Sequence, residues 1–132
     1  MNGTAYDEIA GRYGIVLLLQ FGSTVTGKTH PQSDLDLAVL LGRGSFSFEK
    51  MLALQADLQA LHPERRLDLV ILDVADPLLL KKVTEACQLL YGAPRKLHEL
   101  KILAFKRYQD HRKFLALERA YVDRVAAASR RP

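Results

Sequence analysis

Cysteine is almost absent from this chain of 132 residues: Cys87 is the only one, so no intrachain disulfide can form. No apolar run approaches the length needed to cross a bilayer. The first residues also lack the basic-then-apolar pattern of a secretory signal. Together these absences predict a protein of the cytoplasm, where thiols stay reduced and no membrane is bound.

Histidine patterns typical of zinc sites are also missing. No two of the four histidines are spaced i, i+4, and no cysteines accompany them; they are His30, His62, His98 and His111. Structural zinc sites combine such residues at fixed short spacings, and a metalloprotease helix carries an i, i+4 pair. A zinc site of the usual kinds is therefore not expected.

Length and composition predict one ordinary globular domain. Hydrophobic residues make up 48% of the chain and charged residues 26%, with both signs mixed. A domain of this length buries on the order of two thirds of its unfolded surface, enough for one real core. The 19 basic against 15 acidic residues give a net charge of +4. That excess is compatible with an acidic ligand such as a nucleotide, but by itself it is more typical of a soluble surface.

Two acids stand beside a predicted strand. The apolar runs Ile15–Leu19 and Leu37–Leu41 are bounded by Gly, Ser and Pro, which predicts two buried strands. Side chains alternate along a strand, so Asp34 and Asp36 project to one side and Leu35 to the other. Two carboxylates so close raise each other's pKa unless a cation holds them ionised. Hard oxygen ligands of this kind suit Mg²⁺.

The turn between the two strands offers an anion site. Gly22 allows a sharp turn and a close backbone approach to a ligand, and Ser23 is a suitable N-cap for a following helix. Free N–H groups at a helix N-terminus bind phosphate. Each piece taken alone is more often a plain structural turn. Together, with both acids on one face, they favour a phosphate site next to a metal site.

A third acid is predicted on a third strand, Arg66–Leu72. Asp68 shares one face with Val70, whereas Asp73 falls on the other face, so both acids cannot join the same site. An acid among Leu, Val and Ile is costly to bury without a cation or hydrogen-bond partners. Asp68 is therefore the candidate third carboxylate.

One rival motif overlaps the turn. Residues 22–29, GSTVTGKT, match the letters of a P-loop, GxxxxGK[ST]. A P-loop opens a long helix, but the residues HPQS at 30–33 break any helix directly after Lys28. The match is therefore interpreted as accidental. Mutating Lys28 separates the two hypotheses, because only a P-loop enzyme depends on it more than on the acids.

These residues carry a family resemblance. Gly22-Ser23, ten intervening residues and then Asp34-Leu-Asp36 resemble the signature of the polymerase-β-type nucleotidyltransferases, and the short chain is similar to the minimal members of that superfamily. The strand Arg66–Leu72, the Ala75–Pro77 step and the long C-terminal tail fit as well. Within the superfamily the chain resembles the MntA-like adenylyltransferase antitoxins that are paired with HEPN-domain ribonuclease toxins.

The resemblance implies an α/β (α+β) fold: a small mixed β-sheet with flanking helices and a C-terminal helical tail. It also implies two Mg²⁺ ions, about 4 Å apart, and ATP as substrate. The implied catalytic and metal-binding residues are Asp34, Asp36 and Asp68. The implied nucleotide-binding residues are Gly22, Ser23 and Ser33, with Lys28 in place of the basic residue that many relatives carry directly after the Gly-Ser pair.

The implied function is that of an antitoxin. It would transfer AMP from ATP to a tyrosine of a HEPN toxin and so silence the ribonuclease, without binding nucleic acid directly. The chain has no separate lobe to enclose a bulky substrate, which favours an acceptor on another protein. Two alternatives stay open: an antitoxin that only binds and masks the toxin, and a nucleotidyltransferase acting on a small hydroxyl compound.

The remaining segments are predicted to be mostly helical. Residues 1–13 predict a short helix, and apolar spacing predicts an amphipathic helix at 46–61 that packs on the face of Leu35 and Val39. Pro77 fits a helix start, and Pro94 opens a last helix. We divide the chain into a core, residues 1–92, and a helical tail of the same domain, residues 93–132.

Overall fold

A computed structural model describes residues 2–22, 34–42 and 47–129 of the chain. Its centre is a sheet of four strands in the order β3-β2-β1-β4. Strand β1 is antiparallel to both of its neighbours, and β2 is parallel to β3, so the sheet is mixed. The strands are β1 Leu17–Phe21, β2 Leu35–Leu40, β3 Leu67–Ile71 and β4 Cys87–Tyr91.

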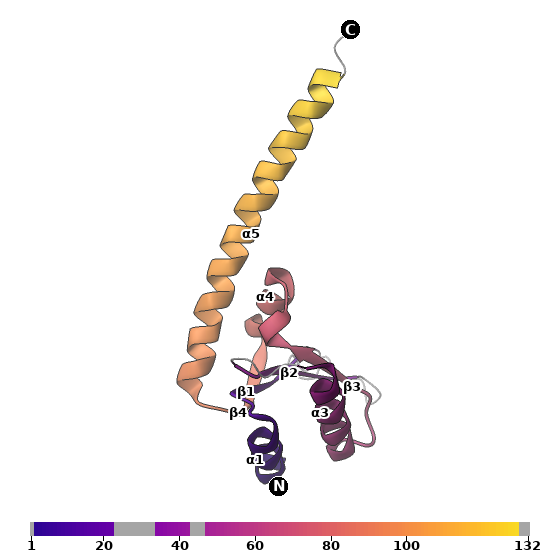
Figure 1. Ribbon diagram of the computed structural model, residues 1–132. Helices are drawn as coiled ribbons and strands as arrows, with labels where there is room; N and C mark the ends of the chain where they lie inside the picture. Colours follow the sequence, from indigo (N-terminus) through magenta and orange to yellow (C-terminus); the bar gives the residue numbers. More distant parts are fainter. Residues whose placement is uncertain (1, 23–33, 43–46, 130–132) are drawn as a thin grey trace.

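Helices cover both faces of the sheet (Figure 1). One face carries α1 and α3, and the other carries α4 and the first part of α5. The long α5 then runs far past the sheet to the C-terminal end (Figure 1). The helices are α1 Asn2–Tyr13, α3 Phe48–Leu61, the short 3₁₀ helix η1 Leu72–Val74, α4 Pro77–Glu85 and α5 Pro94–Ser129.

The first core layer lies between the sheet and α1 and α3. Leu54 and Leu58 of α3 are fully buried and belong to the same apolar cluster as Leu35, Leu37 and Val39 of β2. Helix α3 turns these leucines inward because they are four residues apart, on one face of the helix. The predicted packing of the 46–61 helix on this face of the sheet is confirmed.

The second core layer lies on the opposite face. Leu80 and Val83 of α4 and Leu100 of α5 pack there against Leu19 and Ala38 of the two central strands. Along β2 and β3 this face also carries the acids of the sheet, because residues two apart in a strand share a face. The second face is therefore partly apolar core and partly polar site.

Local sequence signals explain where α4 begins. Asp76 has extended backbone, and its carboxylate accepts a hydrogen bond of 2.8 Å from the Leu79 N–H. Pro77 follows at the first helical position, where its missing N–H costs nothing. This start places α4 directly after β3 and η1, so the helix folds back over the second face.

Our prediction of three strands was incomplete, because the structure adds β4. The segment Cys87–Tyr91 pairs with β1 on the side away from β2. Its residues are intermediate or exposed throughout, so the segment lacks the alternation of burial that marks a half-buried strand. Pairing with the strongly apolar β1 creates this edge strand. The wider prediction of a small mixed sheet with flanking helices and a long C-terminal helix is confirmed.

Two findings bear on the sequence predictions about membranes and about Cys87. Within the described residues, no helix has the length and apolar content to span a bilayer. Cys87 is a free thiol, and burial raises its pKa while Lys101 nearby lowers it. A thiol held mainly protonated is a weak nucleophile, which agrees with leaving Cys87 out of the candidate chemistry.

Candidate functional site

Two carboxylates meet on adjacent strands of the second face. In the parallel pairing of β2 with β3, Asp36 lies directly opposite Asp68. Strands in a sheet are about 4.8 Å apart, so side chains opposite each other on one face are neighbours. Asp34 precedes the first residue of β2 and is exposed, as is Asp68. The structure thus brings the three predicted acids to one edge of the second face.

Gly22 lies directly against the Asp36 carboxylate. Gly22 directly follows β1, and Phe21 at the end of β1 pairs with Asp36. The φ of Gly22 is +83°, and a Cβ placed there would lie only 2.3 Å from Oδ2 of Asp36. Only glycine fits this backbone conformation and this close approach. The predicted turn at Gly22 and the predicted carboxylate at Asp36 are therefore in direct contact.

The electrostatics of Asp36 reflect this crowding. Burial raises the pKa of Asp36 most, and the charges of Asp68 and Asp34 raise it further, while the nearby Lys82 ammonium lowers it. The cause agrees with the geometry, since like charges on neighbouring carboxylates disfavour ionisation. A cation bound among the three acids would relieve this repulsion.

Lys82 is a charged neighbour that our sequence reasoning missed. It lies on α4 and is exposed, and its charge acts on Asp36. The preceding Lys81 is occupied: it pairs with Glu85, and its ammonium lies 4.7 Å from the centre of the Tyr108 ring. Consecutive helical residues point about 100° apart, so only one of the two lysines faces the site. The Lys-Lys pair was visible in the sequence, but the side of the sheet covered by α4 was not.

The donor set fits a hard divalent cation. Carboxylate oxygens are the usual protein ligands of Mg²⁺, which also keeps several waters or substrate phosphate oxygens. Among the described residues, no three His, Cys, Asp or Glu side chains are grouped so that they could hold a metal ion. Asp34, Asp36 and Asp68 therefore stay predicted ligands, for ions that would complete their coordination with nucleotide phosphates.

Two other acids of the chain, Asp73 and Asp57, have structural partners. Both oxygens of Asp73 accept backbone hydrogen bonds, 2.8 Å from the Leu41 N–H and 2.9 Å from the Gly42 N–H. Asp57 accepts from the Tyr13 hydroxyl and from Arg12. These contacts tie the ends of strands and helices together, so neither acid is available to the site. The sequence argument excluded Asp73 by strand alternation, whereas in the structure Asp73 lies in η1, beyond the end of β3, and these hydrogen bonds hold it there.

Part of the predicted site lies outside the described residues. Ser23, Lys28 and Ser33 fall there, as does nearly all of the segment with the P-loop letters. Their predicted contacts with a triphosphate stay predictions. Among the predicted nucleotide-binding residues, only Gly22 belongs to the described part of the chain.

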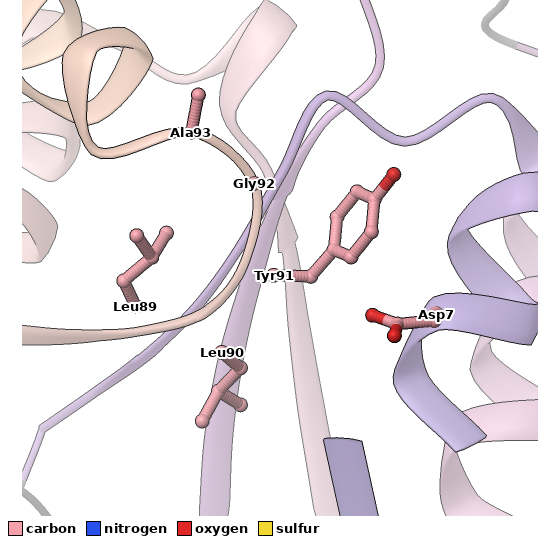
Figure 2. Close-up of a pocket in the computed structure, with 6 residues that line it drawn as sticks. All are labelled: Asp7, Leu89, Leu90, Tyr91, Gly92 and Ala93. Carbon is pink, nitrogen blue, oxygen red and sulfur yellow. The ribbon is translucent and has the colours of Figure 1, made fainter. Parts of the chain in front are cut away.

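A cavity of about 500 Å³ lies at the opposite end of the sheet (Figure 2). It is lined by Asp7 of α1 and by residues 89–93 at the end of β4 and beyond. In Figure 2 the Tyr91 ring points toward the side of α1 that carries Asp7. Because β4 is antiparallel to β1, Tyr91 pairs with Leu18, whereas Cys87 pairs with Phe21 next to Gly22. This cavity is therefore separated from the carboxylates by the length of the strands.

Comparison with known protein families defines the class. The family profile described as "Polymerase beta, Nucleotidyltransferase" matches residues 7–96. That range includes Gly22, all three acids and Lys82. With more than half of the sequence matched, the chain belongs to the polymerase beta nucleotidyltransferase family. No curated protein sequence matches the chain at a significant level.

Solved structures share the fold along nearly the whole chain. A toxin-antitoxin structure with AMP-PNP aligns with a TM-score of 0.74 at 23% identity, covering 96% of this chain and 99% of the other. A tri-AMPylated Shewanella oneidensis HEPN toxin in complex with its MNT antitoxin contains a chain with a TM-score of 0.68 at 21% identity, covering 95% and 96%. A minimal nucleotidyltransferase aligns with a TM-score of 0.56 at 28% identity, covering 66% of this chain and 87% of its own.

Proposed function

We propose that this chain is an antitoxin that transfers AMP from ATP to a tyrosine hydroxyl of a HEPN ribonuclease toxin. The observation that carries the proposal is that Asp36 of β2 lies opposite Asp68 of the neighbouring parallel strand β3, with Gly22 next to Asp36. Membership of the nucleotidyltransferase family supports the reaction class. The fold shared with a chain crystallised with a tri-AMPylated HEPN toxin supports the choice of acceptor.

In the proposed reaction, the tyrosine oxygen attacks the α-phosphorus of ATP. A new P–O bond forms to the tyrosine while the bond to the oxygen that bridges the α- and β-phosphates breaks, and pyrophosphate leaves. The hydroxyl proton passes to a carboxylate, for which we propose Asp68. When bound, two Mg²⁺ ions supply activation of the acceptor oxygen and neutralisation of charge on the phosphates.

The residues of the chain hold the reactants in line. Asp34 and Asp36 would hold the cations, and the backbone at Gly22 and Ser23 would accommodate the triphosphate. Positioning and charge neutralisation supply most of the acceleration in phosphoryl transfer, because the protein has little covalent chemistry to perform. Lys28 and Ser33 stay proposed contacts to the nucleotide.

The decisive experiment uses ATP labelled at the α-phosphate, Mg²⁺ and a HEPN toxin as the candidate acceptor. The wild-type chain should label the toxin, and each of Asp34→Asn, Asp36→Asn and Asp68→Asn should lower the rate by at least about 100-fold, as expected for lost charge stabilisation at the reacting centre. Asp7→Asn is the matched control. Asp7 is an exposed carboxylate next to the cavity at the other end of the sheet, and its variant should keep wild-type activity.

The same variants separate the alternatives. If Asp34→Asn and Asp36→Asn neutralise the toxin as well as wild type at equal stoichiometry, neutralisation is by masking and catalysis is dispensable. The long exposed part of α5 is the observation that favours this second candidate. Label found on a small hydroxyl compound, with none on the toxin, would instead assign the chain to small-molecule transfer.

A further inference from the structure

A row of side chains crosses the second face of the sheet at the end that carries the acids. Asp68 of β3 lies opposite Asp36 of β2, and Asp36 lies opposite Phe21 of β1. Phe21 in turn lies opposite Cys87 of β4. Phe21 is buried, whereas Asp36 is only partly buried and Asp68 is exposed. The row is therefore covered over β1 and open over β3, where the acids lie.

Helix α4 ends beside this row. Its last residue is Glu85, and only Ala86 separates the helix from Cys87, which is a member of the row. Val83 in the last turn of α4 is fully buried in the apolar cluster of the second face. The last turn of α4 is thus held over the acid end of this face, and Lys82 is the basic residue in it.

The two lysines of α4 lie on opposite flanks of its buried face. Successive helical residues point about 100° apart, so Lys81 lies on the flank of Thr84 and Lys82 on the flank of Leu79. Thr84 is buried, and Leu79 packs against the same apolar cluster. The Lys81 ammonium lies 4.7 Å from the centre of the Tyr108 ring of α5, so this flank faces α5. Lys82 is therefore on the flank that faces away from α5.

The side away from α5 is the side of the acids. Burial raises the pKa of Cys87 on β4, and the charge of Lys101 on α5 lowers it, so α5 lies near β4 at this end. β4 and β2 lie on opposite sides of β1, and the flank of Lys82 thus faces β2 and β3 (Figure 1). The electrostatics agree, since burial and the neighbouring acids raise the pKa of Asp36 while the charge of Lys82 lowers it.

The Lys82 ammonium has no partner to give up. Within the described part of the chain Lys82 forms no ion pair or hydrogen bond, whereas Lys81 pairs with Glu85. Lysine binds phosphate as a point charge on a flexible stem. Lys82 therefore offers a positive charge to an anion that binds beside the acids.

We propose that Lys82 binds a phosphate group of the nucleotide, from the α4 side of the acids. This inference rests on the proposed function, because it takes the nucleotide to bind at Asp36 and Asp68. The acids would hold cations, and Lys82 would offset phosphate charge directly. Its role is in binding, so its loss should weaken nucleotide affinity more than it slows transfer at saturating ATP.

The test removes one positive charge from either flank of α4. Lys82→Ala removes the charge that faces the acids, and Lys81→Ala removes the charge that faces α5. The two variants have the same net charge, and alanine is favourable inside a helix. Lys82→Arg keeps the charge. Binding of AMP-PNP with Mg²⁺ is measured by titration calorimetry without any toxin, and AMP transfer to a HEPN toxin is measured across ATP concentrations.

Lys82→Ala should weaken AMP-PNP binding at least about tenfold, as expected for loss of a hydrogen bond between charged groups. KM for ATP should rise by a similar factor, while kcat at saturating ATP stays near wild type. Lys81→Ala should bind AMP-PNP as wild type does, and Lys82→Arg should bind it more tightly than Lys82→Ala does. Lys82 is exposed, so its loss should leave the circular dichroism spectrum unchanged.

Wild-type affinity for AMP-PNP in Lys82→Ala would overturn the inference, as would equal losses in Lys82→Ala and Lys81→Ala. It is also wrong if Lys82→Arg binds no better than Lys82→Ala, or if the wild-type chain does not bind AMP-PNP. The proposed function fails separately. If AMP-PNP binds through Lys82 but the toxin receives no AMP, the phosphate contact stands and transfer to the toxin does not.

Discussion

Gly22→Ala gives the sharpest test of the site, because the structure separates its effects on stability and on catalysis. The added Cβ would lie 2.3 Å from Oδ2 and 3.2 Å from Cγ of Asp36, whereas ordinary contacts begin at 3.4 Å. The carboxylate oxygen would have to move by about 1 Å to restore normal contact. A shift of that size at a reacting centre costs on the order of 100-fold in rate.

The cost in stability comes mainly from the backbone. A φ of +83° is strained for alanine, by about 1 to 2 kcal/mol, and the clash falls on the end of the Asp36 side chain rather than on backbone. The melting temperature should therefore fall by about 3 to 10 °C, leaving a folded protein. Activity is followed as AMP transfer from labelled ATP, and stability by calorimetry.

Gly14→Ala is the matched control. Gly14 has a φ of +67°, so alanine is strained there too, but nothing lies within 4 Å of the added Cβ. This variant should lose similar stability and keep its activity. If Gly22→Ala transfers AMP at more than half the wild-type rate, or if Gly14→Ala is equally inactive, the close contact with Asp36 does not matter to the chemistry.

Three further predictions follow from burial and charge. The pKa of Asp36 is raised on folding, so the folded state keeps this proton to a higher pH than the unfolded chain does, and the stability falls as pH rises above the ordinary aspartate range. Without divalent cations, Asp36→Asn should therefore melt at a higher temperature than wild type at pH 7. The two proteins should melt at the same temperature near pH 3. Lys82→Ala should raise KM for ATP at least about tenfold, since hydrogen bonds to charged groups contribute about 1.5 to 3 kcal/mol; an unchanged KM would place Lys82 outside the site. In urea denaturation, Leu54→Ala, at a fully buried position, should lower the free energy of unfolding by about 2 to 5 kcal/mol. Phe48→Ala, at a position 65% exposed, should change it by no more than about 0.5 kcal/mol. Equal losses of stability in the two variants would contradict the packing of α3.

Alternation along the strands predicted much of the site from sequence. The expected third strand Arg66–Leu72 is observed as Leu67–Ile71, and the face assigned to Asp68 agrees with its position opposite Asp36. This worked because one face of each strand is fully apolar, so the acid in β3 had only one physically acceptable side. The division of the chain into residues 1–92 and 93–132 stays a prediction.

Features that depend on tertiary placement could not be predicted from the sequence. β4 becomes a strand only by pairing with β1, since its own burial shows no alternation. Lys82 enters the site because α4 folds back over the second face, and no local pattern in the sequence gives that direction. The start of β1 was placed two residues early, because Ile15 is as apolar as the strand itself. Boundaries of this kind are the least determined by local sequence.

Burial of the apolar face fixes the register of β2 against β3, and this register also places Asp36 opposite Asp68. Sliding β3 by a single residue would drive Asp68 into the leucine layer and turn Leu67 or Leu69 outward, which burial forbids. Keeping apolar side chains at alternate positions of β2 and β3 therefore also keeps positions 36 and 68 opposite each other. Structures at 21 to 23% identity accordingly share this fold along nearly the whole chain.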